Sequence, residues 1–407
     1  SGYEAAMSWL ALLTAASLAL WLYLLLGRHG FWRARPRIEE ETPRPPTSWP
    51  PVVAVVPARN EAAHVPATLP SLLGQDYPGE FAVVLVDDHS TDGTGAMARR
   101  LAGAGSHRLE VIDAAALPAG WSGKLWALDQ GLRQAALVLP DAAYVLFTDA
   151  DVAHAPGNVM RLVAKAEAED LDLVSLMVRL RCACAWERLL IPPFVFFFQK
   201  LYPFAAVNDA RLPVAAAAGG CMLVRSDALR EAGGIEAIRD RLIDDVALAR
   251  AIKRRPGGGR IWLGLTGTTR SLRGYDHLGG VWNMVARSAD IQLGHSLLLL
   301  IATVLGMTLI YIVPPLAMVV GALVADWPSF GLGVLAMAFM AGCYLPTVRL
   351  YALRPYWTLT LPAAAVLYVA MTVDSAIRHR RGSGGQWKGR VLHPAKDRTS
   401  GVWSHGR

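Results

Sequence analysis

Hydrophobic and polar positions divide this chain into two kinds of segment. Long apolar blocks lie near its ends: Ala5–Gly27 carries no charge, and Ser296–Ala325, Phe330–Val348 and Pro355–Val373 follow the middle part. About 20 apolar residues in a helix are enough to cross the hydrocarbon core of a bilayer. Between these blocks, short apolar runs alternate with amphipathic stretches, which is typical of a folded α/β domain. The pattern predicts a multi-pass membrane protein with one globular domain.

The short apolar runs predict a doubly wound, Rossmann-like α/β sheet. Runs too short for a helix, each followed by a helical stretch, are typical of parallel strands that are buried on both faces. The predicted strands are Val52–Val56, Ala82–Val86, Leu109–Asp113 and Tyr144–Phe147, and the predicted helices end at Leu73 or span Gly93–Ala102 and Lys124–Ala136.

Composition and charge narrow the class of protein. Hydrophobic residues make up 53% of the chain and charged residues only 18%, and much of the net charge of +7 lies beside the apolar blocks. Basic residues in short flanking segments indicate the cytoplasmic side and favour anionic membrane lipids. No basic stripe interleaved with aromatic residues occurs in the globular part, so we do not expect nucleic-acid binding. The four cysteines lack metal-binding spacing, which fits a reduced, cytosolic domain.

These patterns divide the chain into five parts. The topology leaves two alternatives, because one span before the domain and three after it would place the basic C-terminus outside. Either Ser296–Ala325, which contains Pro314 and Pro315, forms a hairpin, or the last block is re-entrant; we expect an inside C-terminus. The parts are an N-terminal transmembrane helix at 1–34, a stiff linker at 35–50, a cytosolic domain at 51–293, a C-terminal transmembrane region at 294–378 and a basic cytosolic tail at 379–407.

Polar clusters follow three of the predicted strands. Pro57–Glu61 follows the first, Asp87–Thr94 the second and Thr148–Asp151 the fourth. Ligands bind beyond the carboxyl ends of the strands in such sheets, so we expect the three clusters to meet on one rim.

Asp149 and Asp151 are candidate metal ligands. Mg²⁺ and Mn²⁺ prefer oxygen ligands, often one or two carboxylates together with substrate phosphates. An Asp-x-Asp pair is alternatively a solvated turn or a helix cap. Its position after a buried strand, beside two other polar loops, favours the metal site.

Three further motifs carry candidate chemistry. Asp87 and Asp88 open a turn, and their carboxylates either cap it or contact a nucleobase or ribose. A glycine-rich turn ends in Lys124 at a predicted helix start, which suits a phosphate. Asp244 and Asp245 begin an amphipathic helix, either as partners of its dipole or as a general base.

Together these motifs resemble the inverting family 2 glycosyltransferases of GT-A fold, which have a mixed sheet. The matching pieces between Pro51 and Asp290 are PARNE, VDDHSTDGT, SGK–LWAL, TDAD, GGCMLVR, GGI and IDD. More narrowly, LPAGWSGKLWAL, ERLLIPPFVFFFQKLYPF and the terminal WKGR resemble the bacterial hopene-associated glycosyltransferases, almost from end to end. That resemblance implies a bacterial inner membrane, with the catalytic domain in the cytosol.

The resemblance also implies roles for individual residues. Two departures from the family pattern bear on them: Asp244 replaces the usual glutamate before the catalytic aspartate, and of the Gln-x-x-Arg-Trp motif only Arg287 is kept, which argues against a processive polymerase. The implied catalytic pair is Asp245 with Asp244; the donor would contact Pro57, Arg59, Glu61, Asp87, Asp88, Lys124, Asp149 and Arg287; Asp151 with Asp149 would bind Mg²⁺ or Mn²⁺; and Gly219, Gly220 and Cys221 would lie near the acceptor.

The aromatic segment at 186–207 is too short to span a bilayer. It is either a buried core helix or an interfacial segment beside the active site. We favour the second interpretation, in which Phe196 and Phe197 contact a lipid acceptor.

The sequence therefore predicts a membrane-bound, metal-dependent, inverting glycosyltransferase. Its partners would be a nucleotide-sugar donor, most simply a UDP-sugar, a lipid acceptor that the subgroup name suggests is hopanoid-related, and membrane lipids; no obligate protein partner is inferred. The alternatives are a polyprenyl-phosphate glycosyltransferase, whose acceptor needs no base, and a catalytically silent membrane protein that binds nucleotide-sugars.

Overall fold

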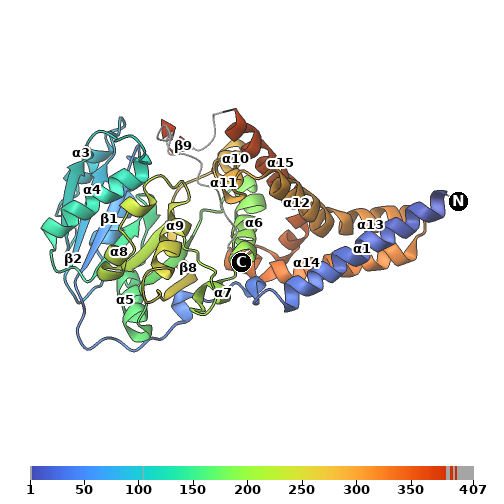
Figure 1. Ribbon diagram of the computed structural model, residues 1–407, viewed down its shortest axis with the longest axis horizontal. Helices are drawn as coiled ribbons and strands as arrows, with labels where there is room; N and C mark the ends of the chain where they lie inside the picture. The colour runs from blue at the N-terminus through green and yellow to red at the C-terminus, as the bar shows by residue number, and fades with distance from the viewer. Residues whose placement is uncertain (1, 104, 382–385, 388–389, 392–407) are drawn as a thin grey trace.

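A mixed eight-stranded sheet forms the globular domain, and a bundle of long helices extends from it (Figure 1). The computed structural model describes residues 2–103, 105–381, 386–387 and 390–391, so most of the predicted tail, including Lys388 and Gly389 of the WKGR motif, lies outside the described residues. The strand order is β3-β2-β1-β4-β7-β6-β8-β5, with β7 antiparallel to both its neighbours and β5 antiparallel to β8. The strands are β1 Val52–Ala58, β2 Phe81–Asp87, β3 Arg108–Asp113, β4 Tyr144–Thr148, β5 Val152–Ala153, β6 Leu173–Arg179, β7 Cys221–Arg225 and β8 Ile261–Ser271.

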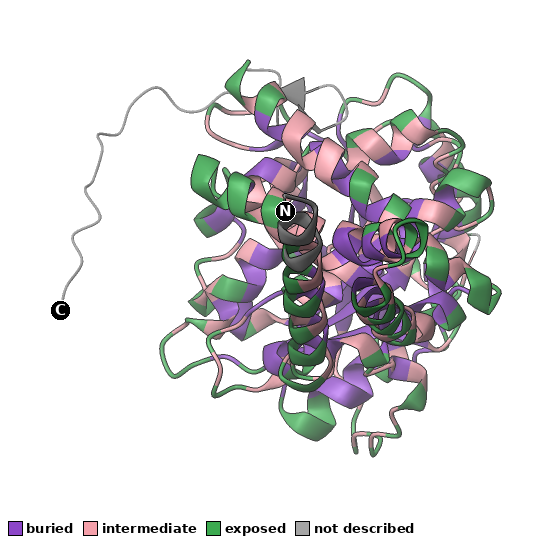
Figure 2. Ribbon diagram, turned by 90° about the vertical axis from the view of Figure 1, so that its right-hand side faces the viewer, coloured by how far each residue is buried: buried purple, intermediate pink, exposed green. Residues whose placement is uncertain are grey.

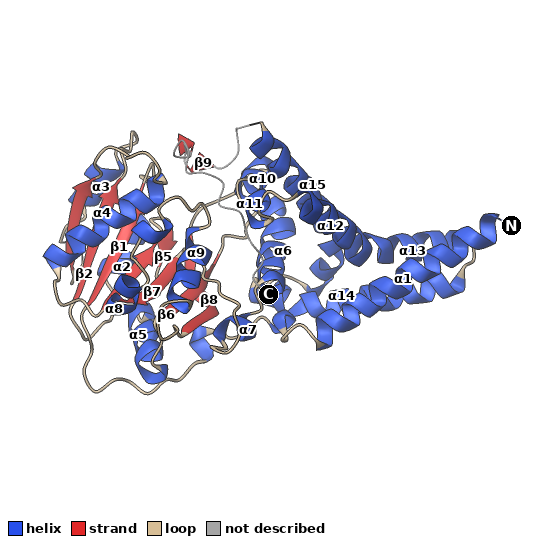
Figure 3. Cartoon of the chain, in the orientation of Figure 1, coloured by secondary structure: helices blue, strands red, loops and turns tan. Residues whose placement is uncertain are grey.

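Burial on both faces of the sheet explains the all-apolar runs. Along β1, Val53 and Val55 pack into one hydrophobic cluster, whereas Val52, Ala54 and Val56 pack into the cluster on the other face. Helix α4 covers the first face by packing on β1 and β2 (Figure 3). The helices of this domain are α2 Val65–Leu73, α3 Thr94–Arg100, α4 Gly123–Val138, α5 Asn158–Glu169, α8 Ser226–Glu231, η3 Glu236–Ile238 and α9 Asp244–Lys253.

The predicted α/β class, the mixed sheet and the apolar terminal helices are confirmed. The four predicted strands correspond to β1 to β4, and the predicted helices to α2, α3 and α4. The sequence did not predict β6 or β8. Both strands mix apolar with polar positions: Ser175 and Arg179 in β6, and the Thr266–Ser271 half of β8.

The segment predicted as a stiff linker is docked on the domain. Arg37 pairs with Leu265 of β8, and the carboxylate of Glu39 accepts hydrogen bonds from Gly267 N at 3.0 Å and from Thr268 Oγ1 at 2.8 Å. Burial alone would raise the pKa of Glu39, but hydrogen bonds from Thr266 and Thr268 hold this pKa below its usual range. The short helix η2, Ile38–Glu40, is therefore part of the folded domain.

Four helices are long and apolar enough to cross a membrane: Trp9–Leu26, Leu297–Leu323, Trp327–Leu350 and Pro355–Arg380. The second candidate runs on through a π-helical turn, with Pro314 in the first turn of α13, where its missing N–H is tolerated. The hairpin alternative for this block is therefore wrong. The elements are α1 Gly2–Leu26, α12 Leu297–Met307, η4 Thr308–Ile312, α13 Val313–Leu323, α14 Trp327–Leu350, η5 Pro355–Thr360 and α15 Leu361–Arg380.

A layer of helices joins the domain to the bundle. Helix α6 packs on α10, α14 and α15, and the hydroxyl of Tyr368 in α15 donates to the carbonyl oxygen of Leu190 in α6 at 2.8 Å. Figure 2 views the molecule from the far end of the bundle and shows exposed residues along α1. This layer comprises η1 Phe31–Arg33, α6 Ala185–Leu201, α7 Phe204–Asn208, α10 Leu278–Ala286 and α11 Ala289–Gln292.

Candidate active site

A cavity of about 890 Å³ lies between the carboxyl ends of the central strands and the joining layer of helices. Its size suits a nucleotide-sugar, since ligand pockets usually enclose about 300–1,000 Å³. The site residues expected from the sequence that line it are Pro57, Arg59, Glu61, Lys124, Asp149, Asp151, Gly219, Gly220, Asp244, Asp245 and Arg287. The structure therefore brings together residues from six separate stretches of sequence.

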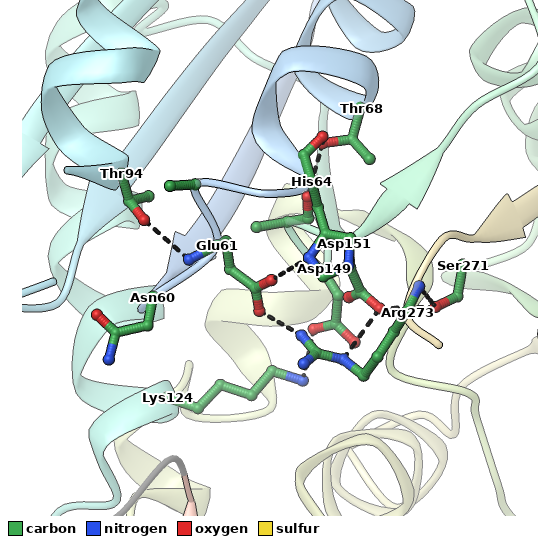
Figure 4. A network of polar contacts seen from close by, with 12 residues as sticks. Asn60, Glu61, His64, Thr68, Thr94, Lys124, Asp149, Asp151, Ser271 and Arg273 are labelled. Carbon is green, nitrogen blue, oxygen red and sulfur yellow. Dashed lines mark hydrogen bonds and ion pairs between the residues drawn. The ribbon is translucent and has the colours of Figure 1, made fainter. Parts of the chain in front are cut away.

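One arginine, just after the end of β8, pairs with two acidic residues at the edge of the cavity, Glu61 and Asp151 (Figure 4). Arg273 forms an ion pair with Glu61 and lies, through Nε, 3.3 Å from Asp151 Oδ2. The hydroxyl of Ser271 donates to the same Asp151 oxygen at 2.6 Å. The carboxylate of Glu61 also lies 2.8 Å from His64 Nδ1. Arg273 thus joins the ends of β1 and β4 across the cavity.

On the other side of the cavity, Lys124 pairs with two aspartates, Asp149 and Asp244. Its Nζ lies 3.0 Å from Asp149 Oδ1 and 3.0 Å from Asp244 Oδ2, so it links the end of β4 to the start of α9. Burial would lower the pKa of Lys124, but the two carboxylates raise it, and the side chain carries a positive charge. Burial and the nearby Asp151 and Asp244 raise the pKa of Asp149 in spite of Lys124. The helix start after Ser122, whose hydroxyl accepts from Leu125 N, positions this lysine.

Asp245 has the environment of a general base. Its Oδ2 accepts from Gly219 N at 2.9 Å and its Oδ1 from Val246 N at 2.7 Å, which fixes the carboxylate in the cavity wall. Burial, together with Asp244, raises the pKa of Asp245 to about 6, while Lys124 opposes the rise. A Cβ on Gly219 would lie 3.4 Å from Lys124 Nζ and 3.5 Å from Asp245 Oδ2, which is ordinary van der Waals contact. A pKa near neutral pH suits proton abstraction.

Asp87 and Asp88 lie behind the cavity wall. The Asp88 side chain is fully buried, with Oδ2 3.6 Å from Arg59 Nη1, and the same Nη1 donates to the carbonyl oxygen of Asp88 at 2.5 Å. Asp87 Oδ1 accepts from Ser90 N at 3.1 Å within a turn that ends at Gly93, whose φ is 87°. Both carboxylates thus shape the turn, and Asp88 positions Arg59, which lines the cavity.

The acidic rim suits a divalent cation that shares its ligands with a substrate. Asp149 and Asp151 supply hard oxygen atoms on one short turn after β4. No cluster of three or more metal-ligating side chains occurs in the part of the chain that the structure describes. Mg²⁺ typically binds through one or two carboxylates and substrate phosphates, and the two aspartates fit that arrangement.

The aromatic segment lies beside the cavity, but the phenylalanines that line the cavity are not the ones expected. Phe194 and Phe198 line the cavity, whereas Phe196 is fully buried against Phe31 of η1 and Tyr344 of α14. Phe197 is half-buried, and its ring packs against Tyr311 of η4 and Tyr368 of α15. The expectation that Phe196 and Phe197 contact the acceptor is therefore wrong: successive residues of a helix point about 100° apart, and these two face the membrane helices.

Sequence reasoning missed several cavity residues. Arg273 and Ser271 were missed because β8 was not predicted, and a polar cluster just after a strand is the signal that would have found them. Tyr275, Asn283 and Arg378 also line the cavity, and they come from the joining layer and from α15. Cys221 was expected near the acceptor but is fully buried in β7 next to the cavity residue Gly220.

Comparisons with known proteins agree with this geometry. Residues 53–233 match the model of glycosyltransferase family 2. A mannosyltransferase from Pyrobaculum calidifontis, solved with GDP-Man and Mn²⁺, is 22% identical and superposes with a TM-score of 0.52 over 91% of this chain and 99% of its own, which shows the fold.

The match to one curated relative covers a shorter part of this chain. The polyprenol monophosphomannose synthase of Mycolicibacterium smegmatis is 31% identical over 118 residues, 28% of this chain, and the match spans 41% of that relative's length. The strand order and the superposition show a domain of GT-A fold, and residues 53–233 of this chain match glycosyltransferase family 2.

Proposed function

We propose that this protein is an inverting glycosyltransferase that moves a sugar from a nucleotide-sugar to a lipid at the cytoplasmic membrane surface. The observation that carries the proposal is Asp245: a carboxylate with a pKa of about 6, held by two backbone N–H groups, in the same cavity as the basic and acidic rim. The same cavity reaches Phe194 and Phe198 next to the membrane helices, where an apolar acceptor would arrive.

Each group of cavity residues would have its own role in the reaction. Asp245 takes the proton of the acceptor hydroxyl, and the acceptor oxygen forms a bond to the anomeric carbon as the bond from that carbon to the diphosphate oxygen breaks. Lys124 and Arg59 lie where they would contact the leaving diphosphate. Asp149 and Asp151 would hold Mg²⁺ or Mn²⁺, which neutralises the charge that develops on the diphosphate. A single displacement of this kind inverts the anomeric configuration.

A direct assay tests the proposal. The full chain in detergent, supplied with Mn²⁺, is incubated with radiolabelled UDP- and GDP-sugars and with bacterial lipid extracts. We expect label to move into the lipid phase with inverted anomeric configuration. A protein that binds nucleotide-sugar but transfers no label to lipid or water would instead support the catalytically silent alternative.

The second candidate function is transfer to a polyprenyl phosphate. Two observations favour it: the matched relative is a polyprenol monophosphomannose synthase, and Arg287 and Arg378 add positive charge to the cavity wall near the membrane. Such an acceptor attacks through a phosphate oxygen that needs no base. The resemblance to the hopene-associated subgroup instead supports a hopanoid-related hydroxyl acceptor, and Asp245 agrees better with a hydroxyl.

A further inference from the structure

Helix α15 has the length and hydropathy of a membrane span, but its surroundings differ from those of the other candidates. Its partners include α6, α10 and α11 of the joining layer, together with α12 and η4, the first part of the second candidate span. Helices α1, α13 and α14 instead pack on one another and extend away from the domain (Figure 1).

The segment before α15 is anchored in the catalytic domain. Leu350 and Tyr351, at the end of α14, are buried in the same hydrophobic cluster as the strands of the sheet. The guanidinium of Arg179, at the end of β6, lies 5.8 Å from the centre of the Tyr351 ring. The helix α14 therefore ends at the domain, and the short η5 leads from there to α15. Leu361 and Ala365 in the first turns of α15 share a cluster with Trp21 and Tyr344, which lie near the domain-side ends of α1 and α14.

The last turns of α15 are also anchored in the joining layer. Asp374 accepts a hydrogen bond from Trp282 Nε1 at 2.6 Å, and Arg378 Nη1 donates to Asn283 Oδ1 at 2.8 Å. The hydroxyl of Ser375 accepts from Asp290 N at 3.0 Å. Arg378 also lines the active-site cavity. Both ends of α15 thus lie on one side, and a straight helix whose two ends lie on one side cannot cross a bilayer.

One face of α15 is apolar and only partly covered by the described residues. Val366 and Ile377 are 48% and 42% exposed, and the residues between them at helical spacing on that face, Ala370 and Val373, are half-buried. Arg380 and Arg381 follow at the end, where lipid headgroups would be. Helix α12 packs on α15, and its first turn is also apolar and exposed at Leu298.

We propose that α15 lies along the membrane surface on the catalytic side, with this apolar face on the lipid, and that it closes the active-site cavity through Arg378. The bundle then crosses the membrane three times, through α1, α12–α13 and α14. The N-terminus lies outside, and the C-terminal tail lies with the catalytic domain, in agreement with its basic charge. The proposal does not depend on the identity of the sugar or of the acceptor.

Labelling of single introduced cysteines with a membrane-impermeant maleimide tests the topology in the full chain. The positions are Arg381→Cys after α15, Ala325→Cys between α13 and α14, and Asp141→Cys in the domain; all three are exposed. In spheroplasts we expect only Ala325→Cys to label, and in inverted vesicles only the other two, above the background of the wild type. Labelling of Arg381→Cys from the same side as Ala325→Cys would overturn the proposal.

A second pair of variants tests the position of the helix in the lipid. Ala370→Arg puts a charge at the middle of the apolar face of α15, and Leu335→Arg puts one on an exposed position within the span α14. A charge inside the hydrocarbon core is costly, whereas one at the headgroups is tolerated. We expect the alkali-resistant membrane fraction to fall several-fold for Leu335→Arg only. An equal fall for Ala370→Arg would overturn the surface placement.

Discussion

At the scale of single residues, the cavity consists of opposite charges that hold one another in place. Arg273 lies between Glu61 and Asp151, and Lys124 lies between Asp149 and Asp244. Each cation keeps two carboxylates of different elements within a few ångströms. Partly buried pairs of this kind position side chains more than they stabilise the fold, because the loss of hydration opposes the attraction. Asp245, whose partners are backbone N–H groups, differs from the other carboxylates in this respect.

Replacement of Asp245 by asparagine tests the general base. Asparagine keeps the shape and accepts one hydrogen bond, but it cannot take a proton. We expect kcat to fall by about 10²–10⁴-fold, while the affinity for the donor nucleotide changes little. Transfer rates and nucleotide calorimetry on the same preparation measure both quantities. Retained activity would favour the polyprenyl-phosphate acceptor.

The pH dependence follows from the same carboxylate. The base form of Asp245 exists above its pKa, which burial raises to about 6. We therefore expect kcat/KM to rise with pH through about 6 and to level off above it. Rates measured between pH 5 and 8, with donor binding monitored in parallel, check this expectation. A flat profile over this range would contradict the role of Asp245.

Asp151 is the test of metal binding. We expect UDP or GDP to bind the wild type at least about tenfold more tightly with Mn²⁺ than with chelator, and Asp151→Ala to lose that difference, which is about 1.4 kcal/mol. Calorimetry measures both affinities without turnover. Glu110→Ala, a change on a peripheral strand, is the matched control. Equal affinities of the wild type with metal and with chelator would exclude a metal-bridged donor.

At the scale of elements, α6 shows how one helix serves two environments. Phe194 and Phe198, four residues apart, face the cavity, while Phe196 faces η1 and α14. The side chains at i and i+4 share a helix face, whereas the one between them points to the opposite side. The helix α6 therefore lines the active-site cavity on one face and belongs to the core between domain and bundle on the other.

The phenylalanines of α6 should respond in two different ways to truncation. Phe196→Ala removes a fully buried ring, so we expect a loss of about 3–5 kcal/mol of stability and a lower melting temperature. Phe198→Ala should instead raise the apparent KM for the lipid acceptor, with a smaller change in melting temperature and little change in donor hydrolysis. Thermal melts and acceptor titrations on both variants separate the effects. Similar melting and kinetic changes in the two variants would contradict the division of faces.

At the scale of the whole molecule, the catalytic domain extends beyond the boundaries expected from the sequence. Its hydrophobic core includes Ala34 before the domain and Leu350 and Tyr351 after it. The segment around Glu39 adds hydrogen bonds to the edge of β8. The domain and the bundle thus share a core, and the active-site cavity lies where they meet.

Truncated chains test the contribution of the segment around Glu39. A fragment of residues 35–293 keeps Glu39 and Ile38, whereas a fragment of residues 51–293 loses both. We expect the shorter fragment to melt at a lower temperature and to bind less nucleotide. The difference should shrink as the pH falls toward the pKa of Glu39, because a carboxylate whose pKa is lowered in the folded state stabilises the fold only while it is ionised. Equal melting of the two fragments would show that the segment is a mere linker.

The sequence by itself determined the class of fold, the first four strands, the apolar helices and most of the polar rim. These features are local: burial on both faces produces apolar runs such as Val52–Val56, and a polar cluster directly after a strand lies at a known edge of the sheet. The carboxylates Asp149 and Asp151 were found in this way, whereas Asp245 was expected from its place at a predicted helix start and from the family resemblance.

Only the tertiary structure decided which residues complete the cavity and where the last helix lies. Arg273 approaches Asp151 because β8 lies beside β6, and no local pattern encodes that pairing. Phe194 and Phe196 are alike in sequence, and only the packing of α6 assigns them to different surroundings. For α15, hydropathy reports length and composition, whereas the placement depends on distant contacts such as Asp374 with Trp282 and Arg378 with Asn283. Such contacts join segments far apart in the chain, so their partners appear only once the chain is folded.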